Sequence, residues 1–130
     1  MSPTPRILIV DDHASVRDGI RAFIEHKTEF VVCGEAENGL TAIGQARDLK
    51  PDLIVMDLAL PRLNGVEAAS VVKSALPNVK IVAFSMYAHE LGRAIASASR
   101  MDAVLPKSSS LTMLVETITR LLRPVVSKPN

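Results

Sequence analysis

Three carboxylates, a serine and a lysine each follow a short apolar run in this sequence. Asp11 and Asp12 come directly after "ILIV", and Asp57 comes after "LIVM". Ser85 and Lys107 end two further apolar segments. Carboxylate oxygens are the ligands that Mg²⁺ prefers, and lysine and serine side chains donate to phosphoryl oxygens. Asp57 could be a metal ligand, a nucleophile that attacks phosphorus, or both.

The elements between these residues decide whether the side chains meet. Short β-branched runs alternate with segments of helical period along the chain, which is typical of parallel βαβ units. We expect strands over residues 6–10, 30–36, 53–57, 80–84 and 102–106. Apolar stripes predict a helix after each strand, the fourth being a weak stripe over 91–98 and the fifth a strong one over 111–122.

The strand sequences also predict an order in the sheet. The segments 6–10 and 53–57 are almost continuously apolar, as expected of central strands covered by helices on both faces. Pro106 cannot donate to a ladder, so the last strand belongs at an edge. A doubly wound α/β sheet with order 2-1-3-4-5 satisfies both conditions. Ligands bind such sheets beyond the carboxyl ends of the strands, at the reversal between the first and third.

The polar residues should therefore converge on one crevice. Three carboxylates placed together repel one another and raise at least one pKa, unless a cation lies between them. Mg²⁺ is the economical cation, and Lys107 with Ser85 would hold an anion beside it. Taken singly, Asp11 and Asp12 are also typical of a helix start. We interpret His13 as a solvent-facing residue of the first helical turn.

The composition limits the classes of protein to consider. A chain of 130 residues with 48% hydrophobic content has the size of one domain. The formal net charge is +1, without a basic block that would indicate a nucleic-acid surface. The single cysteine, Cys33, excludes an internal disulfide and is expected to be a small buried residue. No apolar run approaches the roughly 20 residues of a membrane span, so we expect a soluble, cytoplasmic protein.

The combined pattern resembles the receiver domains of response regulators in two-component signalling. The resemblance covers roughly residues 6–122 and rests on the acidic pair, on Ser85 and Lys107, and on "MDLALPRLNG" with its D-x-x-x-P-x-x-x-G spacing. The segments "DDH", "GEAENG" and "MDLALPRLNG" look most like the NarL/FixJ subfamily. Members of that subfamily usually carry a C-terminal helix-turn-helix domain that binds DNA. The implied fold is the flavodoxin-like (βα)5 receiver fold.

The resemblance also implies roles for individual residues. Asp57 would accept a phosphoryl group from a sensor histidine kinase. Ser85 would move to bond that group, and Lys107 would pair with it. The implied magnesium site consists of four residues: Asp11, which acts through water, Asp12, Asp57 and the main-chain carbonyl of Ala59.

Some positions depart from the family pattern. Val104 stands where the family usually has the aromatic residue of its switch, three residues before the lysine. Tyr87 is the only tyrosine and could take over that role, or it could be an ordinary loop residue. Pro106 precedes Lys107, whereas many relatives have a proline after the lysine.

The expected function is a phosphoacceptor switch rather than an enzyme, catalysing at most its own phosphorylation and dephosphorylation. Residues 1–123 would form the receiver domain, and 124–130 a tail or the stub of a linker. The domain could form a homodimer on phosphorylation, and it would reach DNA only through a C-terminal output domain outside this chain. A whole free-standing receiver and the receiver part of a longer regulator both remain open.

Three other functions compete with this interpretation. A degenerate receiver would act only by binding other proteins. An aspartyl-nucleophile phosphohydrolase would need a second acid two residues after the nucleophile, where this chain has Ala59. A nucleotide- or flavin-binding domain would need a glycine-rich loop after the first strand, which the sequence lacks.

Overall fold

The computed structural model describes residues 3–86 and 101–123. The five predicted strands are confirmed to within one residue at each end: β1 (Arg6–Val10), β2 (Val31–Ala36), β3 (Leu53–Met56), β4 (Lys80–Ser85) and β5 (Ala103–Pro106). Four of the predicted helices are present: α1 (Ala14–Lys27), α2 (Gly39–Leu49), α3 (Gly65–Ala75) and α5 (Leu111–Leu122). The helix expected over 91–98 and the tail 124–130 lie outside the described residues.

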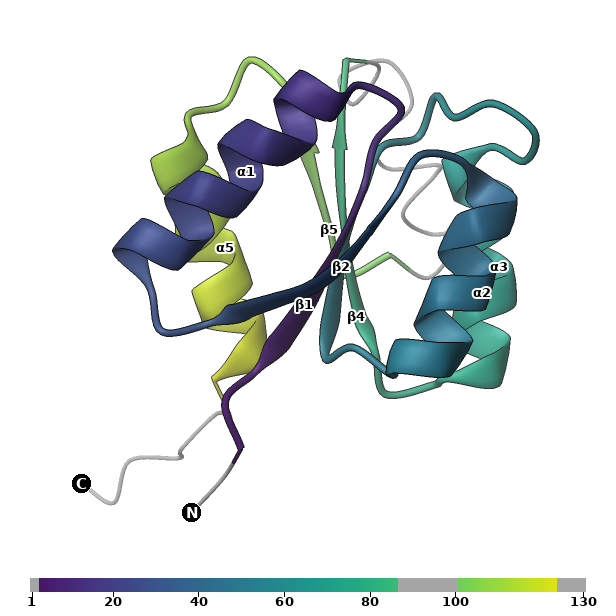
Figure 1. The fold of residues 1–130 in the computed structure, drawn as a ribbon, viewed down its shortest axis with the longest axis horizontal. Helices are drawn as coiled ribbons and strands as arrows, with labels where there is room; N and C mark the ends of the chain where they lie inside the picture. Colours follow the sequence, from purple (N-terminus) through teal and green to yellow (C-terminus); the bar gives the residue numbers. More distant parts are fainter. Residues whose placement is uncertain (1–2, 87–100, 124–130) are drawn as a thin grey trace.

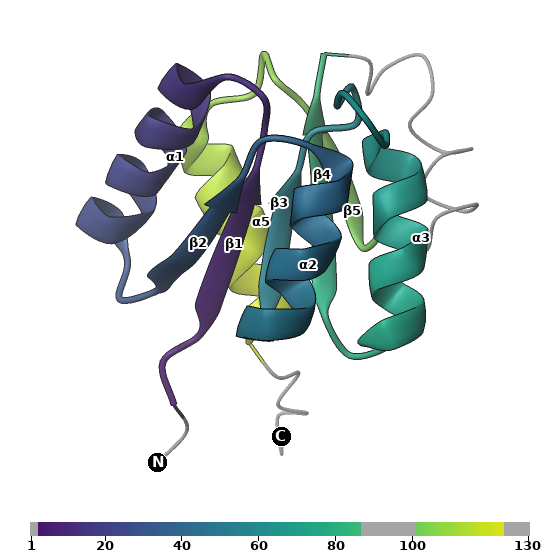
Figure 2. The ribbon, with the colours of Figure 1, turned by 45° about the vertical axis from the view of Figure 1, so that its right-hand side comes forward.

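The strands form one parallel sheet in the order β2-β1-β3-β4-β5, as the sequence predicts (Figure 2). The apolar strands β1 and β3 are its centre, and every residue of β3 is buried. β5, which ends in Pro106, lies at one edge. At the other edge is β2, where Cys33 is half-buried rather than buried, since an edge strand has a neighbour on one side only.

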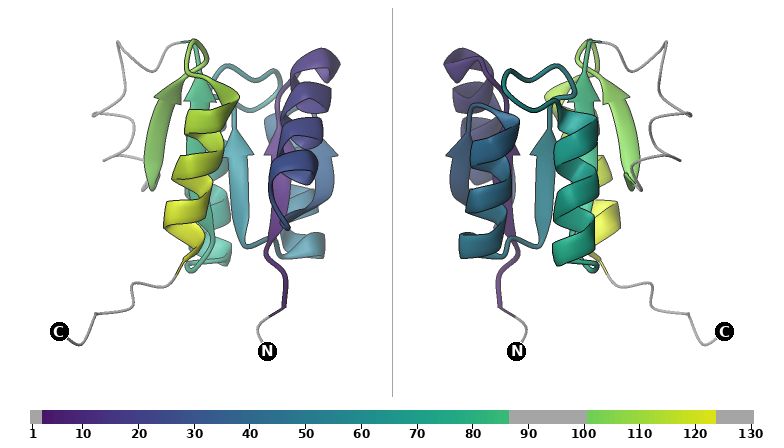
Figure 3. Two further views of the ribbon diagram at one scale, coloured as in Figure 1. Left: turned by 90° about the vertical axis from the view of Figure 1, so that its left-hand side faces the viewer. Right: turned by 90° about the vertical axis from the view of Figure 1, so that its right-hand side faces the viewer.

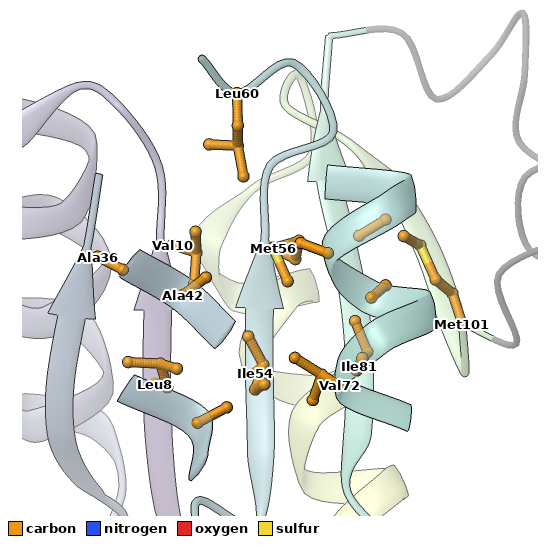
Figure 4. Close-up of a cluster of buried hydrophobic side chains, with 14 of the residues drawn as sticks. Leu8, Val10, Ala36, Ala42, Ile54, Met56, Leu60, Val72, Ile81 and Met101 are labelled. Atoms are coloured by element: carbon orange, nitrogen blue, oxygen red, sulfur yellow. The ribbon is translucent and has the colours of Figure 1, made fainter. Parts of the chain in front are cut away.

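Helices cover both faces of the sheet. α1 and α5 lie on one face, and α2 and α3 lie on the other (Figures 1 and 3). Side chains of β1 alternate between the two layers, because successive residues of a strand point to opposite faces. Ile7 and Ile9 belong to the cluster under α1 and α5. Leu8 and Val10 belong to the cluster under α2 and α3 (Figure 4).

Side-chain caps fix where three of the helices begin. The side chains of Asn38, Asn64 and Ser110 each accept a hydrogen bond from the main-chain N–H three residues further on, at 2.8, 2.9 and 3.1 Å. Such a cap stabilises a helix by about 1 kcal/mol, and it also sets the end of the preceding loop. The segments "ENG", "NG" and "SSS" therefore mark these three helix starts in the sequence, since asparagine and serine are preferred N-cap residues. None of the helices in the described ranges is long and apolar enough to cross a membrane.

Candidate functional site

The carboxyl ends of three strands bring two acids and one lysine together. Asp11 follows β1, Asp57 follows β3 and Lys107 follows β5. The Nζ atom of Lys107 lies 2.8 Å from Oδ2 of Asp11 and 3.1 Å from Oδ2 of Asp57. These three residues therefore converge beyond the carboxyl ends of the strands, at the place where the sequence predicts the ligand site.

Main-chain hydrogen bonds extend each strand by one residue and hold these side chains in place. Asp11 donates its N–H to the carbonyl of Ala36 at 3.0 Å, and Asp57 donates to Val10 at 2.9 Å. Both aspartates are buried, with exposed fractions of 2% and 3%. A carboxylate held this far from water requires a partner charge or a proton, because desolvation disfavours the ionised form.

The pKa values at the site reflect that balance. Burial raises the pKa of Asp57, whereas the hydrogen bond and the charge of Lys107 lower it. The negative charge of Asp11 raises the pKa further, so that it lies above the usual value for an aspartate. Burial alone would lower the pKa of Lys107, but its hydrogen bonds to Asp11 and Asp57 raise it overall. Lys107 thus supplies a positive charge between two of the clustered carboxylates, although it does not restore the ordinary pKa of Asp57.

Asp12 pairs with a residue other than the lysine, namely His13. The Nδ1 atom of His13 lies 2.9 Å from Oδ1 of Asp12 and 3.2 Å from Oδ1 of Asp11. The main-chain N–H of His13 also donates to Oδ1 of Asp11, at 2.9 Å. His13 is exposed, as expected, but its ring contacts both acids. Asp11 therefore offers one oxygen to His13 and the other to Lys107.

The loop that carries Asp57 is held between two helix starts. The main-chain N–H of Ala59 donates to Oδ1 of Asp57 at 3.2 Å. At the start of α3, a Cβ atom on Gly65 would collide with the main-chain oxygen of Asp57. At the start of α2, a Cβ atom on Gly39 would collide with the main-chain oxygen of Leu63. The absence of a side chain at both glycines lets the loop pack tightly against α2 and α3.

Ser85 is the last residue of β4 and is fully buried. Its carbonyl accepts a hydrogen bond from the main-chain N–H of Lys107 at 3.0 Å, so the two residues are neighbours across the sheet. Val104 is partly buried and packs against the hydrophobic cluster under α2 and α3. Tyr87, which we considered as a substitute for the switch aromatic, lies outside the described residues.

An arginine pair on α1, which the sequence analysis missed, contacts the same region. The Nε atoms of Arg17 and Arg21 lie 2.8 and 2.7 Å from the two carboxylate oxygens of Glu35 in β2. Arg17 also donates to the main-chain carbonyl of Asp11 at 2.6 Å. Burial would raise the pKa of Glu35, but the hydrogen bonds and charges of both arginines lower it overall. No local pattern signals this cluster, because its members come from different elements.

Comparison with known proteins identifies the family of this chain. Residues 7–119 match the family model for the response regulator receiver domain. The response regulator protein VraR of Staphylococcus saprophyticus is 39% identical over 117 residues, which cover 88% of this chain and 55% of the relative. VraR of Staphylococcus aureus is 32% identical over 120 residues, covering 92% of this chain and 57% of the relative. The chain thus spans about half the length of these relatives.

Solved structures show the same fold. A LuxR-family two-component response regulator from Aurantimonas sp. matches with a TM-score of 0.86 and 33% identity, over 92% of this chain and 86% of that one. The response regulator domain of Thermotoga maritima CheB matches with a TM-score of 0.83 and 29% identity, over 94% of this chain and all of that one. Given the strand order, the family match and these relatives, this chain belongs to the response regulator receiver domain family.

Proposed function

We propose that Asp57 is the phosphoacceptor of this receiver domain and that a sensor histidine kinase is the phosphoryl donor. The main support is the position of its carboxylate, which lies at the strand reversal and within 3.1 Å of Lys107 Nζ. A buried carboxylate beside a fixed cation is a suitable nucleophile for phosphorus, because the cation can stabilise charge on the phosphoryl oxygens.

The donor atoms around Asp57 suit Mg²⁺. The proposed ligands are all oxygens: the carboxylates of Asp11, Asp12 and Asp57 and the main-chain carbonyl of Ala59. Hard oxygen donors of this kind are the usual ligands of Mg²⁺. Asp11 and Asp57 share the single positive charge of Lys107, so this part of the site retains negative charge for a cation to neutralise. Bound Mg²⁺ would supply positive charge to the phosphoryl oxygens.

The protein's own groups account for the other steps of the transfer. One carboxylate oxygen of Asp57 forms the new bond to phosphorus, and the bond between phosphorus and the donor breaks, so the donor leaves with the electron pair. Lys107 is held protonated by its acidic neighbours and donates to a phosphoryl oxygen. Ser85, beside Lys107 at the end of β4, supplies the second donor through its hydroxyl group.

A shallow pocket beside Lys107 offers a place for the donor protein. It lies between α1 and the start of α5, and its lining includes Val16, Ile20, Phe84 and Leu111. Val16 and Leu111 are partly exposed there, whereas Ile20 and Phe84 are buried, so the pocket has a small apolar surface next to the proposed phosphoacceptor site. An apolar surface of this kind suits a helix of a partner protein.

The output of the switch is proposed from the relatives. Because residues 7–119 match the receiver family model and the relatives are response regulators, we infer that residues 1–123 act as a receiver domain that controls an output, either through a helix-turn-helix domain that binds DNA, as the NarL/FixJ resemblance implies, or through a partner protein. Phosphorylation replaces the carboxylate of Asp57 with a group whose charge is nearly −2, which would change the surface used for homodimer formation. The domain would act as a switch in the cytoplasm, with no turnover beyond its own phosphorylation and dephosphorylation.

Intact-mass measurement tests the phosphoacceptor directly. The wild-type chain is incubated with acetyl phosphate, with and without Mg²⁺, and compared with Asp57→Asn. The matched control is Asp18→Asn, which changes an exposed carboxylate on α1. We expect an adduct of about 80 Da that requires Mg²⁺, persists in Asp18→Asn and disappears in Asp57→Asn. An adduct that survives Asp57→Asn, or none on folded wild-type protein, would contradict the proposal.

A further inference from the structure

The peptide bond between Asp11 and Asp12 joins two of the proposed magnesium ligands, and Arg17 of α1 bonds to its carbonyl. The Nη1 atom of Arg17 donates to the main-chain oxygen of Asp11 at 2.6 Å. Because a peptide group is planar, a fixed carbonyl also fixes the direction of the Asp12 N–H. This one contact therefore restricts the main-chain angles on both sides of the peptide bond, and with them the placement of both acids.

The guanidinium group of Arg17 is itself held by β2. Its Nε atom lies 2.8 Å from Oε1 of Glu35, and the two side chains are only 15% and 24% exposed. The next residue of β2, Ala36, accepts the main-chain N–H of Asp11 at 3.0 Å. Asp11 is thus tied to β2 twice, directly through its N–H and, by way of Arg17, through its carbonyl.

Arg21, one helical turn further along α1, provides a natural comparison. Its Nε atom lies 2.7 Å from Oε2 of Glu35, the other oxygen of the same carboxylate. Within the described part of the chain, its second ion-pair partner is Glu25, at 3.6 Å. The two arginines therefore share a helix and an anionic partner, and the bond to the carbonyl of Asp11 sets Arg17 apart.

We propose that Arg17 is a positioning residue of the phosphoryl-transfer site, which holds the Asp11–Asp12 peptide in the orientation that Mg²⁺ binding requires. The charge of Arg17 would act in the opposite direction, because a cation beside the ligands disfavours the binding of a second cation. Removal of Arg17 should therefore weaken Mg²⁺ binding if the residue acts through geometry, and strengthen it if only the charge matters. This inference rests on the proposed function, because it concerns the same metal site.

Nuclear magnetic resonance measures Mg²⁺ binding without a phosphoryl donor. The amide resonances of Asp12 and Asp57 in the ¹⁵N-labelled 130-residue chain are followed during addition of Mg²⁺ to wild type, Arg17→Gln and the matched control Arg21→Gln. We expect Arg17→Gln to weaken Mg²⁺ binding by on the order of tenfold, and Arg21→Gln to remain within about twofold of wild type. Each variant loses one positive charge and one bond to Glu35, so the difference between them reports the contact with Asp11.

Arg17→Lys separates charge from geometry. Lysine keeps the positive charge, but its single nitrogen lacks the planar fork with which the guanidinium group bonds Glu35 and the Asp11 carbonyl together. We expect this variant also to bind Mg²⁺ more weakly than wild type does. If Arg17→Gln does not fold, Arg17→Lys provides the comparison with Arg21→Gln.

The Mg²⁺ dependence of the acetyl phosphate reaction gives a second measurement. The Mg²⁺ concentration that gives half of the maximal rate should increase in both Arg17 variants. The rate at saturating Mg²⁺ should change by less than about threefold, because Arg17 contacts a ligand residue and not the reacting atoms. A role in stability alone would leave the half-saturating concentration of the folded protein unchanged.

The possible results separate this inference from the function that it extends. Weaker Mg²⁺ binding in both Arg17 variants, with little change in Arg21→Gln, supports the positioning role. Unchanged or tighter binding in a folded Arg17 variant, or an equal loss in Arg21→Gln, would overturn that role and leave the proposed metal site in place. If the wild-type resonances do not respond to Mg²⁺, both the positioning role and the proposed metal site are wrong.

Discussion

Lys107 lies between Asp57 and Asp11, with its Nζ atom 3.1 Å from one carboxylate and 2.8 Å from the other. Its side chain is only 17% exposed, and those of the two aspartates are 3–4% exposed. One lysine thus offsets part of the repulsion between two buried acids that come from different strands. The same residue contributes to the stability of the domain and to its proposed chemistry, which makes its replacement informative.

Replacing Lys107 with methionine should destabilise the domain. The substitution keeps most of the side-chain volume but leaves Asp11 and Asp57 buried without their shared cation. We expect the free energy of unfolding at pH 7 to fall by about 2 kcal/mol, measured by urea denaturation in the absence of divalent ions. Lys27→Met, at the exposed end of α1, is the control and should change stability by less than about 0.5 kcal/mol. Equal effects of the two substitutions would show that Lys107 has no special role in stability.

Glu35 should make stability depend on pH in the acid range. Its pKa is lowered in the folded protein by Arg17 and Arg21, against the effect of burial. The folded state therefore binds a proton less readily than the unfolded state, so stability falls as the pH decreases through the pKa of Glu35. Its contribution is complete at pH values above the usual glutamate range and is lost below it.

Glu35→Gln tests this dependence in a series of urea denaturations between pH 3 and pH 7. We expect the variant to be less stable than wild type by about 1 kcal/mol at pH 7, with the difference disappearing towards pH 3. Glu25→Gln, on the more exposed surface of α1, serves as the control with a smaller difference. A difference for Glu35→Gln that stays constant over the whole pH range would contradict the expected ionic origin.

Two glycines of α2 should respond to alanine in opposite directions. A Cβ atom on Gly39 would collide with the main-chain oxygen of Leu63, whereas a Cβ atom on Gly44 would have open space around it. Gly44→Ala should therefore stabilise the domain by about 0.5–1 kcal/mol, because alanine is the better helix former. Gly39→Ala should destabilise it by about 2 kcal/mol, since the loop that carries Asp57 must shift.

Thermal and urea unfolding of both glycine variants checks the stability changes. The acetyl phosphate reaction then adds a functional measurement: Gly39→Ala should form the adduct more slowly than wild type, and Gly44→Ala should react at the wild-type rate. If Gly39→Ala were as stable and as reactive as wild type, the close packing of the loop against α2 would have no consequence for Asp57.

A second ion pair, which is partly buried, should anchor the start of β5. Lys73 of α3 lies 2.9 Å from Oδ2 of Asp102, and the same oxygen accepts the main-chain N–H of Ile81 at 2.8 Å. Lys73→Met should lower the free energy of unfolding by about 2 kcal/mol, because the partly buried Asp102 loses its cation. A double-mutant cycle with Asp102→Asn should give a coupling energy of about 1 kcal/mol. Strictly additive effects would argue against the pair.

The sequence alone determined the order of the strands, the starts of three helices and the end of the sheet at which the polar residues meet, which is the carboxyl end of the strands. These features follow from local information: continuous apolar runs mark central strands, Pro106 marks an edge, and Asn38, Asn64 and Ser110 cap helices through residues only three positions away. Such patterns depend on neighbours in the chain, so they can be read without the fold.

Only the tertiary structure decided how the charged side chains pair. Asp11 and Asp57 share Lys107, Asp12 turns to His13, and Glu35 takes two arginines from α1. Apart from Asp12 and His13, which are neighbours in the chain, these pairs join segments far apart in the sequence, so they depend on how the fold brings the segments together and on the direction that each side chain takes. The sequence predicts that the site residues meet at the carboxyl ends of the strands. Side-chain packing in the folded protein determines which ion pairs form among them.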